Sequence, residues 1–101
     1  MIRGTTPTII LTLNKVDLTS LKSVYVTFCQ YGKMITKKNG DEGVAITEHS
    51  VSVSLTQEET LRLTPGTVEV QLRGLTKGGD AFATNVATVV VKEVLLEEVI
   101  T

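Results

Sequence analysis

The dominant pattern of this chain is an alternation of hydrophobic and polar side chains at every second position, which predicts β-strands. The clearest alternation lies in Thr67 to Leu75, where Val68, Val70 and Leu72 share one parity and polar residues fill the other. A strand of this kind buries one face and turns the other toward water or a polar partner. Ser23 to Tyr31 shows the same period with many β-branched and aromatic residues, so we predict a central strand there.

Short extended segments recur along the whole chain, separated by turn sequences. This spacing is typical of an antiparallel β-sandwich rather than of a parallel α/β sheet, and no long helix competes. Two hairpin turns are predicted at Asn39-Gly40 and Gly78-Gly79, because these residues reach positive φ at little cost. The first is expected to bring Val44 to Ile46 back alongside the preceding strand. The seven predicted strands are Thr8 to Leu13, Ser23 to Tyr31, Met34 to Lys37, Val44 to Ile46, Ser50 to Leu55, Thr67 to Leu75 and Phe82 to Val91.

Two short helical turns complete the predicted fold. Asp17 can cap a turn that places Leu18 inward. Thr56 and Glu59 have the spacing of a capping box, a simpler interpretation than a catalytic pair of carboxylates. The fold class predicted from these patterns is all-β: one antiparallel, immunoglobulin-like β-sandwich of about seven strands over residues 1–101, with one or two short helical turns.

Composition argues against several classes of partner. The chain has 10 basic and 11 acidic residues and a net charge of −1, so no long-range field attracts nucleic acid or an anionic membrane. Four aromatic residues and no tryptophan leave few platforms on which bases or sugar rings could stack. No stretch reaches the roughly 18 apolar residues of a membrane span, and no basic and apolar leader is visible.

The residues that carry chemistry are too sparse for an active site. His49 and Cys29 are the single histidine and the single cysteine, whereas a zinc site needs three or four nitrogen or sulfur ligands. Asp41, Glu42 and Asp80 lie in glycine-containing turns, where acids usually bind neighbouring backbone amides. We therefore expect a non-enzymatic protein with no catalytic, metal or cofactor-binding residues and no small-molecule substrate.

The last ten residues, 92–101, do not fit the sandwich pattern. Alternation breaks down toward the end of the chain, a sign of burial on both sides, and the terminal strand accounts for residues only to about Val91. Two interpretations remain open: the segment folds back on its own domain, or it forms an interface with a partner. Our hypothesis is an interface, because five apolar side chains follow in close succession. These are Val94, Leu95, Leu96, Val99 and Ile100.

Several blocks of the sequence resemble small proteins encoded in the tail-gene clusters of phages and prophages of Gram-positive bacteria. The blocks are residues 1–8 (MIRGTTPT), 52–61 (SVSLTQEETL), 66–73 (GTVEVQLR) and 94–100 (VLLEEVI). A weaker similarity, in strand order and size, is to the N-terminal domains of phage baseplate upper proteins. The resemblance implies a β-sandwich module of the virion tail or baseplate, made in the host cytoplasm and present in several copies. It supplies no catalytic residues.

Three functions follow as expectations. The first is a structural component of the phage tail that contacts other phage structural proteins and forms homo-oligomers. The second is a regulator or assembly factor outside the virion that binds a phage or host protein. The third is a small enzyme or glycan-binding module, which the scarcity of clustered titratable groups and aromatic residues disfavours.

Overall fold

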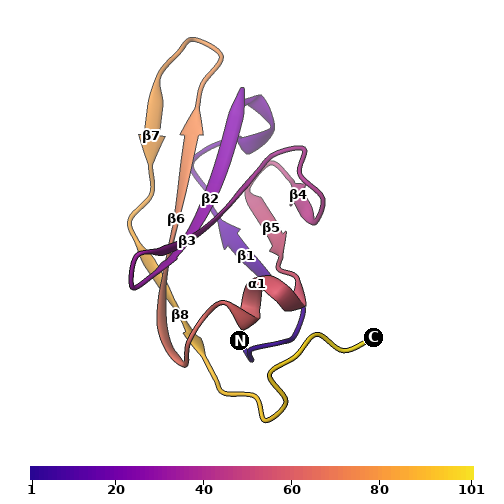
Figure 1. Ribbon diagram of the computed structural model, residues 1–101. Helices are drawn as coiled ribbons and strands as arrows, with labels where there is room; N and C mark the ends of the chain where they lie inside the picture. Colours follow the sequence, from indigo (N-terminus) through magenta and orange to yellow (C-terminus); the bar gives the residue numbers. More distant parts are fainter.

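Eight strands form two antiparallel sheets that pack face to face, so the chain is an all-β sandwich (Figure 1). The computed structural model describes residues 1–101. A 3-10 turn, η1 (Leu18–Ser20), and one short helix, α1 (Gln57–Leu61), are the two helical turns. The strands are β1 (Thr8–Thr12), β2 (Ser23–Gln30), β3 (Lys33–Lys38), β4 (Val44–Ile46), β5 (Ser50–Ser54), β6 (Gly66–Leu75), β7 (Ala81–Ala83) and β8 (Ala87–Val91).

The larger sheet has five strands, with β2 and β6 at its centre, and the central position predicted for β2 is confirmed. β3 pairs with one edge of β2, while β7 and β8 both pair with the far edge of β6. The single strand predicted over Phe82 to Val91 is therefore broken into two. Thr84 lies at the break, where its N–H donates to Leu72 O at 2.9 Å and its hydroxyl accepts from Leu72 N at 3.1 Å.

The smaller sheet has the order β1-β5-β4 and corrects one prediction. β4 does not return alongside β3 but crosses to the other sheet and pairs with β5. The reason lies in the local hydrogen bonds: Asn39 is tied to Val24 through its N–H and its side-chain oxygen, each at 3.0 Å. Asp41 Oδ2 then accepts from Lys38 N, and Gly43 at φ +83° redirects the chain. The Asn-Gly turn thus serves as a crossover between sheets.

Hydrophobic residues from both sheets meet in one core. β2 contributes Val24, Val26 and Phe28, and β5 contributes Val51 and Val53, all essentially inaccessible to solvent. The inward and outward parities are those that the sequence predicts for both strands. Because the side-chain period of a strand is two, a slip of one residue in either strand would turn its hydrophobic side chains toward solvent.

Both predicted helical turns are confirmed with their caps. The Asp17 side chain accepts from Thr19 N at 3.0 Å, and Leu18 is buried. At α1, Thr56 Oγ1 accepts from Glu59 N at 3.1 Å while a Glu59 carboxylate oxygen accepts from Thr56 N at 2.9 Å. α1 lies at the lower end of the sandwich, close to the N-terminal segment (Figure 1).

The hairpin predicted at Gly78-Gly79 is present. Thr76 N donates to Asp80 O and Gly79 N donates to Thr76 O, which defines a three-residue loop. Of the two glycines only Gly79 has positive φ, so the loop is a type I turn followed by a left-handed residue rather than a type I′ turn.

The expected burial of the last strand on both sides is wrong. Val91 is buried and Val89 packs against the core, whereas Val86 and Val90 are exposed on the outer face of the sheet. β8 is a one-sided strand at the sheet edge, so Val90, its apolar residue of the other parity, is exposed.

Gly74 is predicted to be intolerant of any side chain. A Cβ there would lie 2.6 Å from two atoms of the Phe82 ring and 3.1 Å from Leu21 Cδ1, and both side chains pack against the core. Gly74→Ala should lower the free energy of unfolding by about 1–3 kcal/mol, because overpacking forces the ring to shift. Urea titration measures the change. Gly78→Ala is the control, since the nearest atom to its Cβ would be Thr76 Oγ1 at 3.9 Å; equal losses would contradict the steric explanation.

Candidate functional site

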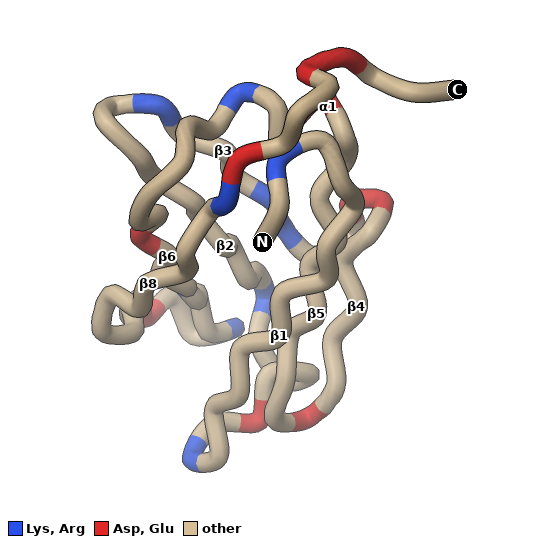
Figure 2. The backbone as a smooth tube through the Cα atoms, turned by 90° about the horizontal axis from the view of Figure 1, so that it is seen from below, with Lys and Arg blue, Asp and Glu red and all other residues tan.

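The segment that follows β8, residues 92–101, lies along the surface beside the N-terminal residues and α1 (Figures 1 and 2). We call it the tail. Its first residue is held by the N-terminal strap, Met1 to Arg3: Lys92 N donates to Met1 O at 2.7 Å and Arg3 N donates to Lys92 O at 3.1 Å. Ile2 and Lys92 form an isolated parallel bridge. The tail therefore starts from a fixed position at the edge of the larger sheet.

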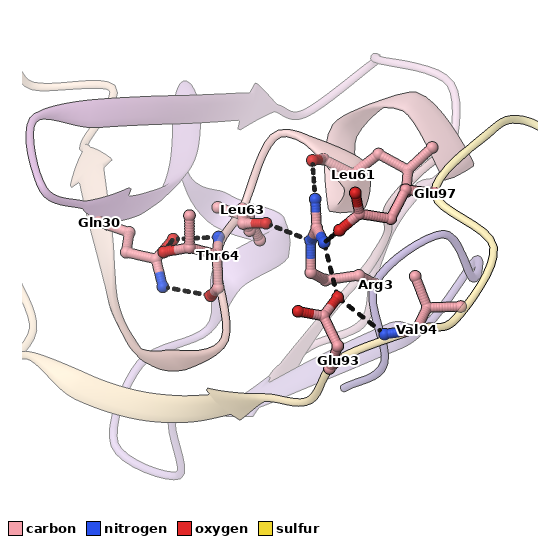
Figure 3. Close-up of polar contacts among 8 residues, drawn as sticks. All are labelled: Arg3, Gln30, Leu61, Leu63, Thr64, Glu93, Val94 and Glu97. Carbon is pink, nitrogen blue, oxygen red and sulfur yellow. Dashed lines mark hydrogen bonds and ion pairs between the residues drawn. The ribbon is translucent and has the colours of Figure 1, made fainter.

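Arg3 connects the strap and the tail to the end of α1 and the segment that follows it (Figure 3). Its Nε donates to Leu63 O at 2.6 Å and its Nη2 donates to Leu61 O at 2.9 Å. Its Nη1 contacts two tail carboxylates, that of Glu93 at 2.7 Å and that of Glu97. The Arg3 side chain is only 12% exposed. A planar guanidinium suits this position because its donors point in several fixed directions at once.

The charges around Arg3 reinforce one another. Hydrogen bonds to Glu97 and then to Glu93 raise the pKa of Arg3. The pKa of Glu93 is lowered, first by the hydrogen bond from Val94 N and then by Arg3. The cluster therefore stays ionised at neutral pH and keeps the first half of the tail in place.

The far end of the tail is held by one side chain of α1. Gln57 Nε2 donates to Ile100 O at 3.2 Å, and Ile100 N donates to Gln57 Oε1 at 2.8 Å. Elsewhere a hollow of about 610 Å³, lined by Ser54, Glu58 and Val99 among others, separates this end from the smaller sheet. The contact is thus a pair of hydrogen bonds without close packing.

The apolar side chains of the tail are largely outside these contacts. Val94 is half-buried beside Gly4, where a Cβ on the glycine would lie 3.9 Å from Val94 Cγ1. Leu95 is fully exposed, and Leu96 and Ile100 are 54% and 62% exposed. Val99 is exposed as well. The backbone of the tail folds back on its own domain, as one of the two open interpretations expects, while four of the five predicted interface side chains face solvent.

A second ion pair joins α1 to the larger sheet. Lys37 Nζ lies 2.8 Å from Glu59 Oε2, and both side chains are mostly buried. Burial alone would raise the pKa of Glu59, but the hydrogen bonds from Lys37 and Thr56 outweigh it and lower the pKa. This pair fixes the helix that carries Gln57.

Acid should weaken the attachment of α1 to the larger sheet through the ion pair of Glu59 and Lys37. Because the pKa of Glu59 is lower in the folded chain than in the unfolded chain, its stabilising contribution is complete above about pH 4.3 and is lost as the pH falls through the folded value. The melting temperature of Glu59→Gln should therefore fall less between pH 7 and pH 3 than that of the unchanged chain. Glu58→Gln, at an exposed neighbour without an ion pair, is the control; a pH dependence as steep in Glu59→Gln as in the unchanged chain would contradict the prediction.

The residues considered for metal or acid–base chemistry lie apart from the tail. His49 is exposed in the turn before β5, with Nδ1 3.0 Å from Val16 O. Cys29 is a free, half-buried cysteine on β2. Asp41 caps Lys38 N in the crossover turn, as turn chemistry predicts. No three His, Cys, Asp or Glu side chains gather where they could hold a metal ion, and no helix is long and apolar enough to cross a membrane.

Sequence reasoning identified the apolar residues of the tail but missed the residues that hold it. Arg3 and Gln57 are separated from their tail partners by 94 and 43 positions. No local spacing reveals such pairs.

Searches with the chain find no matching family model, curated protein or solved structure.

Proposed function

We propose that this chain is a non-enzymatic structural component of a phage or prophage tail or baseplate. It acts through protein–protein contacts made by residues 92–101, the C-terminal segment that we call the tail. The observation that carries the proposal is the contrast between the two sides of the tail. Its backbone and carboxylates are fixed by Arg3 and Gln57, while Leu95, Leu96, Val99 and Ile100 face solvent. A segment that is held in place while its apolar side chains stay exposed is typical of a protein–protein interaction surface.

The energetics support an interface. Full burial of an exposed side chain of this kind is worth roughly 1.5–3 kcal/mol. Leu95 can gain all of this, and the partly exposed Leu96, Val99 and Ile100 can gain a share of it. Because the tail is already ordered, a partner does not have to supply the cost of ordering it, which favours binding. The resemblance of the sequence to tail-cluster proteins supplies the setting: copies made in the host cytoplasm and joined to other phage structural proteins or to one another in the virion tail.

The test is to look for the chain in purified particles by quantitative mass spectrometry, with the unchanged chain and with a Leu95→Ser/Leu96→Ser/Ile100→Ser variant. We expect the unchanged chain at a fixed copy number per particle and the variant strongly depleted. Ile10→Ser is the matched control, because Ile10 is equally exposed on the smaller sheet. Binding to a phage or host protein in extracts, with reproducible absence from particles, would instead support a regulator or assembly factor.

A further inference from the structure

The large exposed hydrophobic side chains gather mainly in two places. One is the tail surface, defined by Leu95, Leu96, Val99 and Ile100. The other is the outer face of the larger sheet, which we call the sheet face. Its exposed hydrophobic residues are Tyr25, Met34, Val86 and Val90, from four segments of the chain. Two unpartnered apolar surfaces on one chain raise the question of whether they fit each other.

The sheet face is hollowed. One hollow of about 330 Å³ is lined by Tyr25, Thr27 and Arg73 among others. A second, of about 150 Å³, is lined by Thr27, Met34 and Val86 among others. Because Thr27 lines both, the two hollows are neighbours on the outer face of β2. Apolar side chains that protrude from another surface can enter such hollows.

Charge makes the two surfaces complementary. Tyr25 pairs with Lys38 on one side and with Arg73 on the other, so a lysine and an arginine lie opposite Tyr25 on the two neighbouring strands. Neither cation has an ion pair. The tail carries Glu97 and Glu98 between two apolar pairs, and Glu98 has no ion pair either. The sheet face has one acid of its own, Glu69, which lies four positions along β6 from Arg73.

The two surfaces of one chain cannot meet while the tail is in its observed position. Arg3 and Gln57 hold the tail against α1. α1 is joined through Glu59 to Lys37, whose parity on β3 is that of buried Ile35 and thus points away from the sheet face. The tail therefore lies beside the inner side of the sheet. A contact between the tail surface and the sheet face requires a second copy of the chain.

We propose that the tail surface of one copy docks on the sheet face of the next, with Glu98 between Lys38 and Arg73. This inference rests on the proposed function and names its partner as a second copy. The contact is heterologous: each copy offers one surface and receives on the other. Such contacts generate rings when the rotation closes and filaments when it does not.

The experiment uses two variants of the full chain, each lacking one surface. The tail variant is Leu95→Asp/Ile100→Asp, and the sheet-face variant is Met34→Glu/Arg73→Glu; all four positions are exposed. Circular dichroism checks that each is folded. If the tail variant is not folded, Leu96→Ser replaces it. If the sheet-face variant is not folded, Arg73→Ala replaces it. Light scattering after size-exclusion chromatography, over a wide concentration range, gives the mass of each variant, of the unchanged chain and of an equimolar mixture.

We expect the unchanged chain to form oligomers, each variant alone to remain monomeric and the mixture to form a 1:1 dimer that does not grow. Ile10→Glu should assemble like the unchanged chain. Monomers in the mixture, or a sheet-face variant that still assembles, would overturn the head-to-tail contact. If only the tail variant fails to assemble, the tail binds another surface and the proposed function stands. If the unchanged chain is monomeric throughout, the self-contact is overturned, while detection in particles still decides the proposed function.

Discussion

Replacing Gln30 by leucine should lower the free energy of unfolding by about 2–4 kcal/mol, although the change adds apolar surface to a buried site. Gln30 is 3% exposed at the end of β2. Its Nε2 donates to Thr64 O at 2.7 Å, and its Oε1 accepts from Thr64 N at 2.8 Å and from the Thr64 hydroxyl at 3.2 Å (Figure 3). Leucine would leave a donor and an acceptor of Thr64 unpaired, and each such loss costs about 1–3 kcal/mol.

The same substitution on a neighbouring strand provides the control. Gln71 Nε2 makes a single hydrogen bond, to Thr84 O at 2.8 Å, so Gln71→Leu should cost about 1 kcal/mol. Urea titration of both variants measures the difference. If Gln30→Leu is no less stable than Gln71→Leu, the pairing with Thr64 does not hold the loop between α1 and β6.

Arg3→Ala is expected to destabilise the chain and to release the tail. The two hydrogen bonds to Leu61 O and Leu63 O come from a charged donor, and their loss should lower the free energy of unfolding by about 2–3 kcal/mol. Without the guanidinium, Glu93 and Glu97 lose their ion pairs, so the tail should open more often. Trypsin should then cleave after Lys92 several-fold faster, because cleavage follows the population of the open form.

Two further variants define what Arg3 supplies. Arg3→Lys keeps the charge but not the fork of donors, so it should give an intermediate cleavage rate. Arg62→Ala removes an exposed arginine whose side chain forms no ion pair, and it should leave both stability and cleavage unchanged. Cleavage after Lys92 at the same rate in Arg3→Ala and in the unchanged chain would show that other contacts hold the tail.

The parts of the fold that the sequence predicts are those with local causes. The alternation in β2 and β6, the cap at Asp17 and the capping box at Thr56 all depend on residues within a few positions of one another. The crossover of β4 was not predictable from its turn, because Asn39-Gly40 suits a hairpin and a change of sheet equally well. Which sheet β4 joins depends on β5, whose partners are decided by the packing of the whole core.

In the candidate site, too, the sequence predicts the part that depends on neighbouring residues and not the part that depends on distant ones. Its apolar residues are visible in the sequence because five of them crowd into 94–100 with few polar residues between. Arg3 gives no such signal, since its four acceptors belong to residues 58 to 94 positions away. Exposure of Val86 and Val90 was also hidden, because hydrophobicity alone does not say which face of an edge strand a neighbour covers.

The pairing of the N-terminal strap with Lys92 has a consequence for the timing of biogenesis. The bridge between Ile2 and Lys92 closes a loop of nearly the whole chain, so it forms only after the segments between have been synthesised and folded. A nascent or truncated chain without residue 92 lacks both the bridge and the ordered tail. The surface proposed for assembly thus becomes available only on chains whose sandwich is complete, which would keep unfinished copies out of a growing polymer.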